Sequence, residues 1–414
     1  MKRIGIILLG ALAMVMAGCS KYAGSDSPSA PLENAWMGDE SLPVPVQFAA
    51  SPGVGLQSKT MIHDFADLEY RLGIFALNLD GKAGLTRNSY DVYLDNEQAR
   101  CVYDEVRRKD MIKFNENKYY PYSSDRNLSF FGYYPYFTNN TPEYYADSIR
   151  IAIPADEWGK HDILCASSFA DTMFVKKDAD LGYYVPVEEA EATHYYNGFN
   201  ATYMRFLNRN NLYEEKMPHL LLKHKTTCFV FEAYLTGVES DEVTDFDQVP
   251  VIRSIEITGQ PIYESAYLTV AKKDIEDKAN WSGELHVVGN GNGTLKLGGQ
   301  RAADLNSTPD PVTRKYDIGD NQFFLQPMDA SEKLTIKVTL ENPYNGKRET
   351  FEAKFPKLPA EIVRFEEGKY YPFTITINYF AGVEISASID PWQNGWTENT
   401  ENDNLGEDVP SGEL

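Results

Sequence analysis

The sequence has few positively charged residues, few histidines and few cysteines, and each shortage excludes a class of partner or site. Only 39 Lys and Arg residues stand against 61 Asp and Glu residues, so the 414-residue chain has a formal net charge of −22. Phosphate backbones and anionic lipid surfaces are bound through basic patches, so we expect no nucleic-acid partner and no charge-driven docking on lipid. The six His and four Cys residues are scattered, and no metal site is expected.

Catalytic signatures are also missing. The chain has no H-E-x-x-H, P-loop or G-x-S-x-G motif. The run Gly289–Gly293 lies between two short apolar segments with no helix after it, so we expect a hairpin turn there. The aspartates 241, 245 and 247 lack the glycine and the final Glu of a calcium loop. We therefore expect no enzymatic activity and no cofactor.

One long hydrophobic run, Ile4–Ala17, follows Lys2 and Arg3 and ends next to Gly18 and Cys19. Its length suits a signal-peptide core better than a membrane-spanning helix. Its end resembles a bacterial lipobox, which implies cleavage after residue 18 and a lipid on the Cys19 sulfur. The alternative is an ordinary secretion signal in which Cys19 is incidental. The lipobox implies an exported outer-membrane lipoprotein on the cell surface.

Three cysteines besides Cys19 remain in the exported chain, namely Cys101, Cys165 and Cys228. An odd number does not form a closed disulfide framework. Cys165 and Cys228 lie in apolar, strand-like runs, so we expect buried free thiols.

Tyr and Phe, in contrast, are abundant, with 27 and 21 residues, and both favour strands. Apolar and polar residues alternate over 334–340, 373–379 and 383–389, which predicts strands with one buried and one wet face. Helical periodicity is rare, and one short helix is expected within Ala201–Leu212. The expected fold class is all-β, with two tandem antiparallel β-sandwich domains.

Composition divides the chain into five expected segments. Residues 1–18 are the lipoprotein signal peptide, 19–43 a flexible tether, 44–217 the N-terminal sandwich, 218–396 the C-terminal sandwich, and 397–414 an acidic disordered tail. The first strand is expected at Val44–Ala50, where Val44, Val46 and Phe48 alternate with other residues. Because prolines are confined to sheet edges, Pro45 suggests an edge strand.

The order of several short motifs resembles the fimbrillin family, the subunits of bacterial type V pili. The motifs include the lipobox at Cys19, the strand Pro45–Phe48, the aromatic strand Phe130–Tyr136 and the closing Asp390-Pro391-Trp392. The likeness spans most of residues 44–396. It implies transthyretin-like sandwiches and a stalk, tip or accessory subunit of a cell-surface fimbria that serves adhesion.

The resemblance also implies an assembly mechanism. A surface protease of trypsin-like specificity cuts after a basic residue and releases the first strand, Val44–Ala50. A strand of the next subunit then fills the groove by β-augmentation, and head-to-tail filling makes a filament. The first basic residue after the strand is Lys59, where the family more often has Arg. The alternative is that Lys59 is an ordinary loop lysine. Arg71 lies in an expected strand and should be protected.

The expected donor strand is C-terminal, with Val383, Ile385, Ala387 and Ile389 alternating. Either this strand is donated, or the subunit accepts a strand without donating one. Trp392 and Trp396 are expected to pack at the end of the sandwich. The implied partners are other fimbrial subunits, the outer membrane through the lipid on Cys19, and surface ligands of host or bacterial cells.

Two further hypotheses concern sugars. Asp147-Ser148-Ile149 and Asp171-Thr172-Met173 resemble an acceptor motif for O-glycosylation, with Ser148 and Thr172 as the modified residues. The alternative function is an outer-surface glycan-binding module, with sugar rings stacked on exposed aromatics of the Tyr-rich stretches 119–145 and 183–203.

Overall fold

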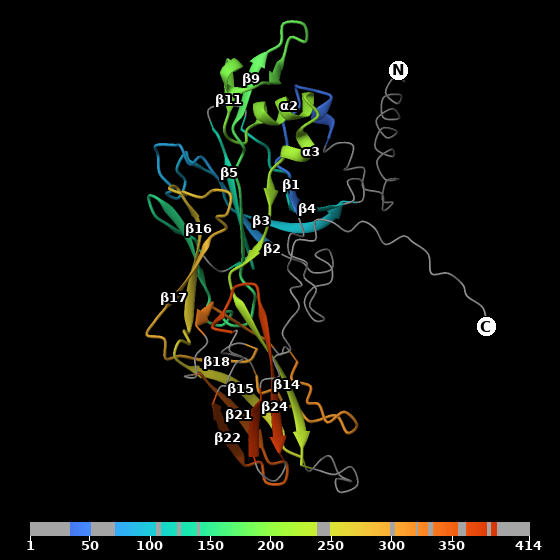
Figure 1. The fold of residues 1–414 in the computed structure, drawn as a ribbon, viewed down its shortest axis with the longest axis vertical. Helices are drawn as coiled ribbons and strands as arrows, with labels where there is room; N and C mark the ends of the chain where they lie inside the picture. Colours follow the sequence, from blue (N-terminus) through green and yellow to red (C-terminus); the bar gives the residue numbers. More distant parts are fainter. Residues whose placement is uncertain are drawn as a thin grey trace, which may run out of the picture.

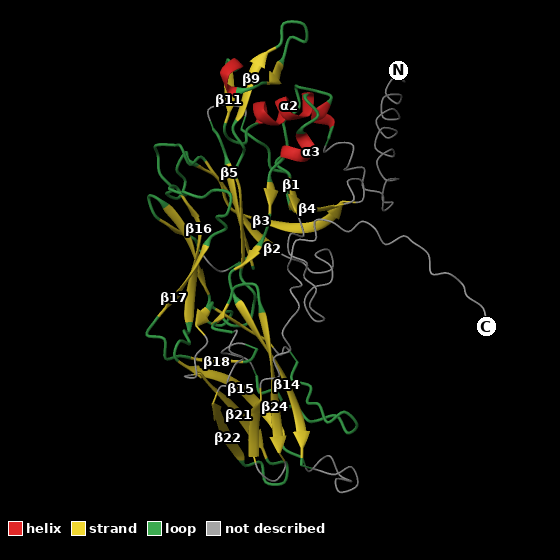
Figure 2. Ribbon diagram, viewed as in Figure 1, coloured by secondary structure: helices red, strands yellow, loops and turns green. Residues whose placement is uncertain are grey.

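The computed structural model describes residues 34–50, 71–104, 109–121, 126–138, 141–237, 249–298, 303–319, 322–329, 334–354, 362–378 and 382–386. Regular structure in these residues is almost entirely β-strand, which confirms the expected all-β class. The molecule is elongated, and its helices gather at one end (Figures 1 and 2).

The largest sheet has eight strands in the order β12-β1-β4-β3-β2-β5-β8-β13. Its strands are β1 (Phe48–Ala50), β2 (Arg71–Leu77), β3 (Val92–Asp104), β4 (Lys109–Phe114), β5 (Ser129–Tyr134), β8 (Leu164–Ser168), β12 (His219–Leu220) and β13 (Lys223–His224). Every residue of β2 after Arg71 is buried. A strand reads as a continuous apolar run when both faces of its sheet are covered, and here they are.

The first covering layer is the sheet β17-β16-β7-β6. It is formed by β6 (Glu143–Tyr144), β7 (Ser148–Ile153), β16 (Ser265–Lys272) and β17 (Glu284–Val288). β7 pairs antiparallel with β16, with Ile151 opposite Leu268. Strands from both sides of residue 217 therefore share one sheet, and the expected division into 44–217 and 218–396 does not separate the sheets. Alternation of apolar and polar residues predicts a strand but does not predict which strand it pairs with.

The second covering layer holds the helices and a small sheet. The helices are η1 (Ala35–Met37), η2 (Glu189–Glu191), α2 (Ala201–Arg209) and α3 (Tyr213–Lys216), and the sheet β10-β9-β11 contains β9 (Met173–Lys177), β10 (Tyr184–Pro186) and β11 (His194–Tyr196). In α2, Tyr203, Met204 and Leu207 recur at helical spacing on the buried face. The Asn200 side chain caps the helix by accepting from the Tyr203 N–H at 2.9 Å.

The other end of the molecule is a sandwich of the sheets β19-β14-β24-β25 and β18-β15-β21-β22. The strands are β14 (Thr227–Thr236), β15 (Val251–Gly259), β18 (Thr294–Lys296), β19 (Gln322–Leu325), β21 (Leu334–Glu341), β22 (Arg348–Lys354), β24 (Tyr370–Asn378) and β25 (Gly382–Ser386), beside the short pair β20 (Met328–Asp329) and β23 (Arg364–Phe365). Alternate residues are buried along β21 and β24, as the alternation predicted.

The run Gly289–Gly293 does not close a hairpin. β17 precedes it and pairs with β16, whereas β18 follows it and pairs with β15. The run therefore carries the chain from one sheet to another, and positive φ angles at Gly289 and Gly291 allow the change of direction. The expected hairpin turn was therefore wrong, because the strands on either side of the run belong to different sheets.

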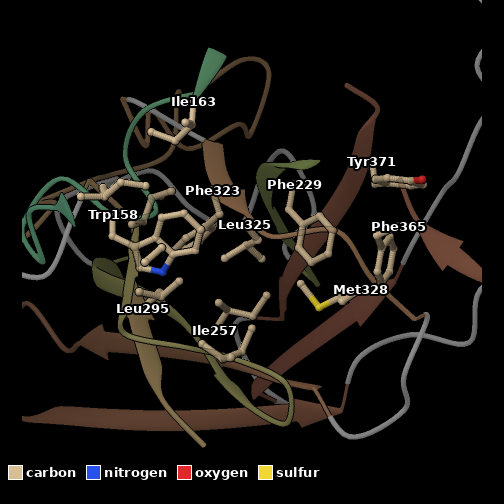
Figure 3. Close-up of a cluster of buried hydrophobic side chains, with 14 of the residues drawn as sticks. Trp158, Ile163, Phe229, Ile257, Leu295, Phe323, Leu325, Met328, Phe365 and Tyr371 are labelled. Carbon is tan, nitrogen blue, oxygen red and sulfur yellow. The ribbon is translucent and has the colours of Figure 1, made fainter. Parts of the chain in front are cut away.

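The buried apolar side chains form two separate clusters. Core 1 runs through the sandwich and into the face of the large sheet that meets β7 and β16, and it includes Phe131, Trp158, Phe231, Leu268 and Ile375. Figure 3 shows part of it, including Trp158, Phe229 and Phe323. Core 2 lies on the other face of the large sheet, under the helices, and it includes Trp36, Phe48, Phe130, Met204 and Leu220.

Candidate functional site

The first strand lies inside the large sheet, between β4 and β12. Ala49 stands opposite Met111 of β4 in antiparallel pairing and opposite His219 of β12 in parallel pairing. The Ala49 N–H donates to the Pro218 carbonyl at 3.1 Å. The expectation of an edge strand was wrong, because this segment has neighbours on both sides.

Pro45 is accommodated because it precedes β1 and its neighbours make the hydrogen bonds. The Val46 N–H donates to the Lys118 carbonyl at 2.7 Å, and the Tyr120 N–H donates to the Val44 carbonyl at 2.9 Å. Pro45 itself needs no donor there, since the bonds fall on the residues before and after it.

The alternating side chains of this segment point into core 2. Val44, Val46 and Phe48 are 1%, 5% and 0% exposed. The Phe48 ring packs edge-on against Phe130, with ring centroids 4.9 Å apart, and against Phe114 at 5.9 Å. Burial of an apolar side chain contributes about 1.5–3 kcal/mol, so these three side chains are a substantial part of core 2. We call the space that residues 44–50 occupy between β4 and β12 the strand groove.

Residues 34–43, expected within the flexible tether, are folded against the helices. Trp36 is 2% exposed, and its ring packs edge-on against Tyr213 with centroids 5.3 Å apart. The tether was predicted from Ser, Gly, Pro and Asp content, which says little about a single large aromatic. Burial of Trp36 in core 2 holds η1 in place, so this part of the expected tether is folded.

Polar groups of α2 hold the same segment. Arg205 Nη2 donates to the Leu42 carbonyl, Asn208 Nδ2 donates to the Met37 carbonyl at 3.0 Å, and Arg209 pairs with Glu40. We call the surface of α2 and α3 that carries residues 34–43 the helix pocket. The sequence analysis did not predict this contact, although a tryptophan in a polar stretch could have indicated that residues 34–43 pack against the fold.

The candidate processing site and the basic residue expected to be protected differ in whether the structure describes them. Lys59 lies outside the described residues. Arg71 is the first residue of β2, where it stands opposite Arg100 of β3. It therefore lies in a strand, as the sequence predicted.

The expected donor strand is described in part. Val383 and Ile385 lie in β25, opposite Ile377 and Ile375 of β24. β25 is the last strand of its sheet and has one neighbour in it. Cys19, Ala387, Ile389, Trp392 and Trp396 lie outside the described residues.

The two candidate glycosylation residues differ in accessibility. Ser148 is 8% exposed in β7, and its hydroxyl donates to Asp147 Oδ1 at 3.1 Å. A sugar on Ser148 stays a prediction, and the burial of this side chain argues against it. Thr172 is exposed just before β9, and its modification stays a prediction.

Exposed tyrosines are spread over the described residues, and Tyr184 and Tyr195 bring two of them together on the small sheet at the helical end. Tyr195 is 55% exposed and Tyr184 is 37% exposed. The His194 ring stacks on Tyr195 with centroids 6.2 Å apart and an interplanar angle of 26°, while Tyr184 is tilted against His194. These rings come from the stretch 183–203 that the sequence singled out.

The cysteines within the described chain are buried free thiols, as expected for Cys165 and Cys228. Burial raises the pKa of Cys165 to about 12 and raises that of Cys228 as well. A thiol in this state is a poor nucleophile.

His219 lies on β12 and is exposed, whereas His224 lies on β13 and is buried. In the described part of the chain, no three His, Cys, Asp or Glu residues converge as metal ligands, and no helix is both long and apolar enough to span a bilayer.

His224 belongs to a polar cluster where the large sheet meets the sandwich. Its Nδ1 pairs with Asp162, and Thr226 Oγ1 donates to the same carboxylate at 2.6 Å. Burial alone would lower the pKa of His224, but the charge and hydrogen bond of Asp162 outweigh it and raise the pKa above its usual value. The Gly368 N–H donates to the Thr226 carbonyl at 2.9 Å, which ties the cluster to the sandwich.

No family model and no curated protein matches this sequence. Solved structures do show likeness. A candidate cell adhesion protein from Bacteroides uniformis is 16% identical, with 84% of this chain and 98% of that chain covered at a TM-score of 0.42. A candidate cell adhesion protein from Bacteroides fragilis is 11% identical over 84% and 98%, at a TM-score of 0.36. The fimbrial anchor protein Mfa2 from Porphyromonas gingivalis is 7% identical over 84% and 99%, at 0.28. Because these TM-scores lie below 0.5, the likenesses do not identify a function.

Proposed function

We propose that the chain is a structural subunit of a cell-surface fimbria, assembled by protease-triggered strand exchange and serving cell adhesion. The observation that carries the proposal is the insertion of residues 44–50 between β4 and β12, with Val44, Val46 and Phe48 in core 2. A strand that completes a core from the N-terminal end of the chain can be freed by a single cut. The proposal includes no enzymatic activity and no cofactor.

Lys59 is the proposed cut. No other Lys or Arg occurs between Lys21 and Arg71, so a trypsin-like protease that cuts there releases the first strand in one piece. The upstream part of that piece would carry the lipid on Cys19, so the same cut would separate the subunit from the outer membrane.

The vacated groove would strongly favour a replacement strand. The Lys118 and Pro218 carbonyls and the Tyr120 N–H would lose their partners, and the apolar sites of three side chains would open. Unpaired strand edges above an apolar groove are templates for β-augmentation. A strand from the next subunit would occupy the groove, and this heterologous contact repeats into a filament. The C-terminal strand at β25 is the proposed donor, which suits a stalk subunit; a tip or accessory subunit would accept only.

Electron microscopy of the full chain after limited trypsin treatment tests the proposal. Wild type and Lys59→Arg should form fibres, whereas Lys59→Gln should remain monomeric under the same conditions. Mass spectrometry of the fibres should find the new N-terminus at Thr60. Fibres that retain the intact N-terminus, or fibres of Lys59→Gln, would contradict protease-triggered exchange.

A second candidate function is glycan binding through the small sheet β10-β9-β11. Exposed Tyr195 and its stacked neighbour His194 favour it, because aromatic faces are common platforms for sugar rings. A glycan array should then show binding by wild type that Tyr195→Ala loses. Binding that depends on Tyr195 in a chain that never forms fibres would favour this function over the fimbrial one.

A further inference from the structure

An open pocket of about 500 Å³ lies between β17 and the short pair β20 and β23, and none of the residues that line it belongs to residues 34–50. We call it the sandwich pocket, and the segments around it are 260–263, 287–291, 326–329 and Arg364. Pockets that bind small molecules commonly have volumes of about 300–1,000 Å³. The sandwich pocket is therefore large enough for a small ligand, and the glycine run that joins two sheets forms part of its wall.

The Tyr263 side chain is held in place on one wall of the pocket. The Tyr263 carbonyl accepts a hydrogen bond from Trp158 Nε1 at 2.8 Å, and the neighbouring Ile262 is fully buried. Gly291 lies against the end of the Tyr263 ring, where a Cβ atom would come within 3.2 Å of the hydroxyl oxygen. No hydrogen bond joins that hydroxyl to another of the described residues. The wall therefore presents a positioned aromatic ring whose hydroxyl is available to a ligand.

Gln326 adds a buried acceptor to the lining. The residue is 7% exposed, and its Nε2 donates to the Pro261 carbonyl. This bond fixes the orientation of the amide, because the reverse orientation would set two oxygens against each other. Gln326 Oε1 is buried and has no hydrogen-bond partner within the part of the chain that the structure describes. A buried acceptor without a donor is unfavourable, so a ligand that brings a hydroxyl group to this atom would be stabilised.

The charges of the lining cancel. Asp329 of β20 stands opposite Arg364 of β23, and Arg364 Nη1 donates to Asp329 Oδ1 at 3.4 Å. The other described residues that line the pocket are uncharged, although the whole chain has a net charge of −22. An anionic ligand would compete with Asp329 for the guanidinium, and a cationic ligand would compete with Arg364 for the carboxylate. This balance favours a neutral polar ligand.

The lining also combines hydrogen-bonding groups with apolar surface. Arg364 and the Asn290 amide are donors, whereas Asp329 and Gln326 Oε1 are acceptors. Tyr263, Val287 and Pro327 supply aromatic and apolar contacts beside them. A sugar ring matches both sets of groups, because its hydroxyls donate and accept hydrogen bonds while its C–H groups pack on apolar and aromatic side chains.

We propose that the sandwich pocket binds a neutral sugar ring at the end of a glycan. One sugar hydroxyl donates to Gln326 Oε1, neighbouring hydroxyls bind Asp329 and Arg364, and the ring contacts Tyr263. The open side of the pocket leaves room for the rest of the glycan. The inference goes beyond fimbrial assembly, and its site is distinct from the candidate glycan surface at Tyr195, which lies on β11 in the small sheet.

Saturation-transfer NMR of the uncut full chain tests the inference. The probes are the methyl glycosides of glucose, galactose, mannose and N-acetylglucosamine, whose blocked anomeric oxygen mimics the linkage to a longer glycan. At least one of them should bind, and its uronic-acid analogue should bind at least fivefold more weakly because the lining has no unmatched positive charge. Absence of binding by all four neutral glycosides, or tighter binding by the charged analogue, would overturn the inference.

Variants of the lining locate the site. Tyr263→Phe and Asp329→Asn should each weaken binding at least fivefold, and the Asp329 side chain is 86% exposed, so its change should leave the fold intact. The matched control Tyr344→Phe, at a 67% exposed tyrosine between β21 and β22, should change binding less than twofold. Binding that survives both lining variants would overturn the inference, and its loss in Tyr195→Ala would move the sugar to the small sheet. Because the chain is uncut, these results do not depend on whether fibres form.

Discussion

The two hydrophobic cores differ in how they are connected to the chain. Core 1 draws on residues from both halves of the sequence, from Phe75 to Ile377, and joins the large sheet to the sandwich. Core 2 depends on one short N-terminal stretch for Trp36, Val44, Val46 and Phe48. A core completed by one end of the chain can be opened without cutting the rest of the fold. Under the proposed function, core 1 would stay intact during assembly, and core 2 would be the part of the fold in which a strand is exchanged.

The largest expected effect comes from truncating one phenylalanine in each core. Phe48→Ala and Phe231→Ala should each lower the free energy of unfolding by about 3–5 kcal/mol, because both side chains are fully buried. Hydrogen exchange should separate the two variants. Phe48→Ala should speed exchange in β4 and β12 and leave β14 and β24 protected, whereas Phe231→Ala should weaken β14 and β24. If both variants lost protection equally throughout the chain, the two cores would unfold as one cooperative unit, and the distinction between them would be wrong.

A smaller effect is expected when Trp36 is changed. Trp36→Ala leaves a cavity in core 2 and should cost about 3 kcal/mol, seen as faster exchange in α2. Trp36→Phe should stay within about 1 kcal/mol of wild type, because it removes a buried donor that has no partner among the described residues. A large loss from Trp36→Phe would mean that the indole N–H is satisfied in solution.

A still smaller effect is expected for the ion pair between Arg209 and Glu40. Glu40→Gln should cost less than about 1 kcal/mol, because the Glu40 side chain is 67% exposed and water screens the pair. The matched control is Glu352→Gln, which breaks a similarly exposed pair with Lys337 on the sandwich. Glu40→Gln should speed exchange around residues 34–43, and Glu352→Gln should not. The same local change in both variants would show that the charge does not hold the segment.

The smallest effect concerns the pH dependence of stability that comes from His224, in the polar cluster where the large sheet meets the sandwich. The pKa of His224 is higher in the folded chain than its usual 6.5, so the folded state binds the proton more tightly than the unfolded state. The resulting stability is complete below about pH 6.5 and is lost as pH rises through the folded pKa. The melting temperature of wild type should therefore fall relative to His224→Gln between pH 6 and pH 8.5. A difference in melting temperature between the two proteins that stays constant over this range would show that His224 does not stabilise the contact between the large sheet and the sandwich.

Much of the fold could be predicted from local sequence, and the parts that could not be predicted have physical causes. Alternation at Leu334–Leu340 and Phe373–Tyr379 predicted strands that the structure describes as β21 and β24, and Val44, Val46 and Phe48 predicted a buried face. Pairing of β7 with β16 could not be predicted, because residues 148–153 and 265–272 meet only through tertiary packing.

The site shows the same limit. The first strand was predicted from the alternation of Val44, Val46 and Phe48, and its exchange is a proposal that rests on a family resemblance. The docking of Trp36 on α2 and α3 was not foreseen. Composition predicted a flexible tether for residues 19–43, whereas the buried side chain of Trp36 holds η1 against α3 within residues 34–43. Trp36 and the helices α2 and α3 lie far apart in the sequence and meet only in the folded chain.

Native mass spectrometry of the full chain after limited trypsin treatment tests the exchangeable role of core 2 most directly. Wild type should yield assemblies in which the fragment ending at Lys59 has been lost and each lost fragment is matched by one bound neighbouring subunit. Lys59→Gln, treated in the same way, should stay a monomer with residues 34–50 in place. Assemblies in which every subunit still carries its N-terminal fragment would contradict the account.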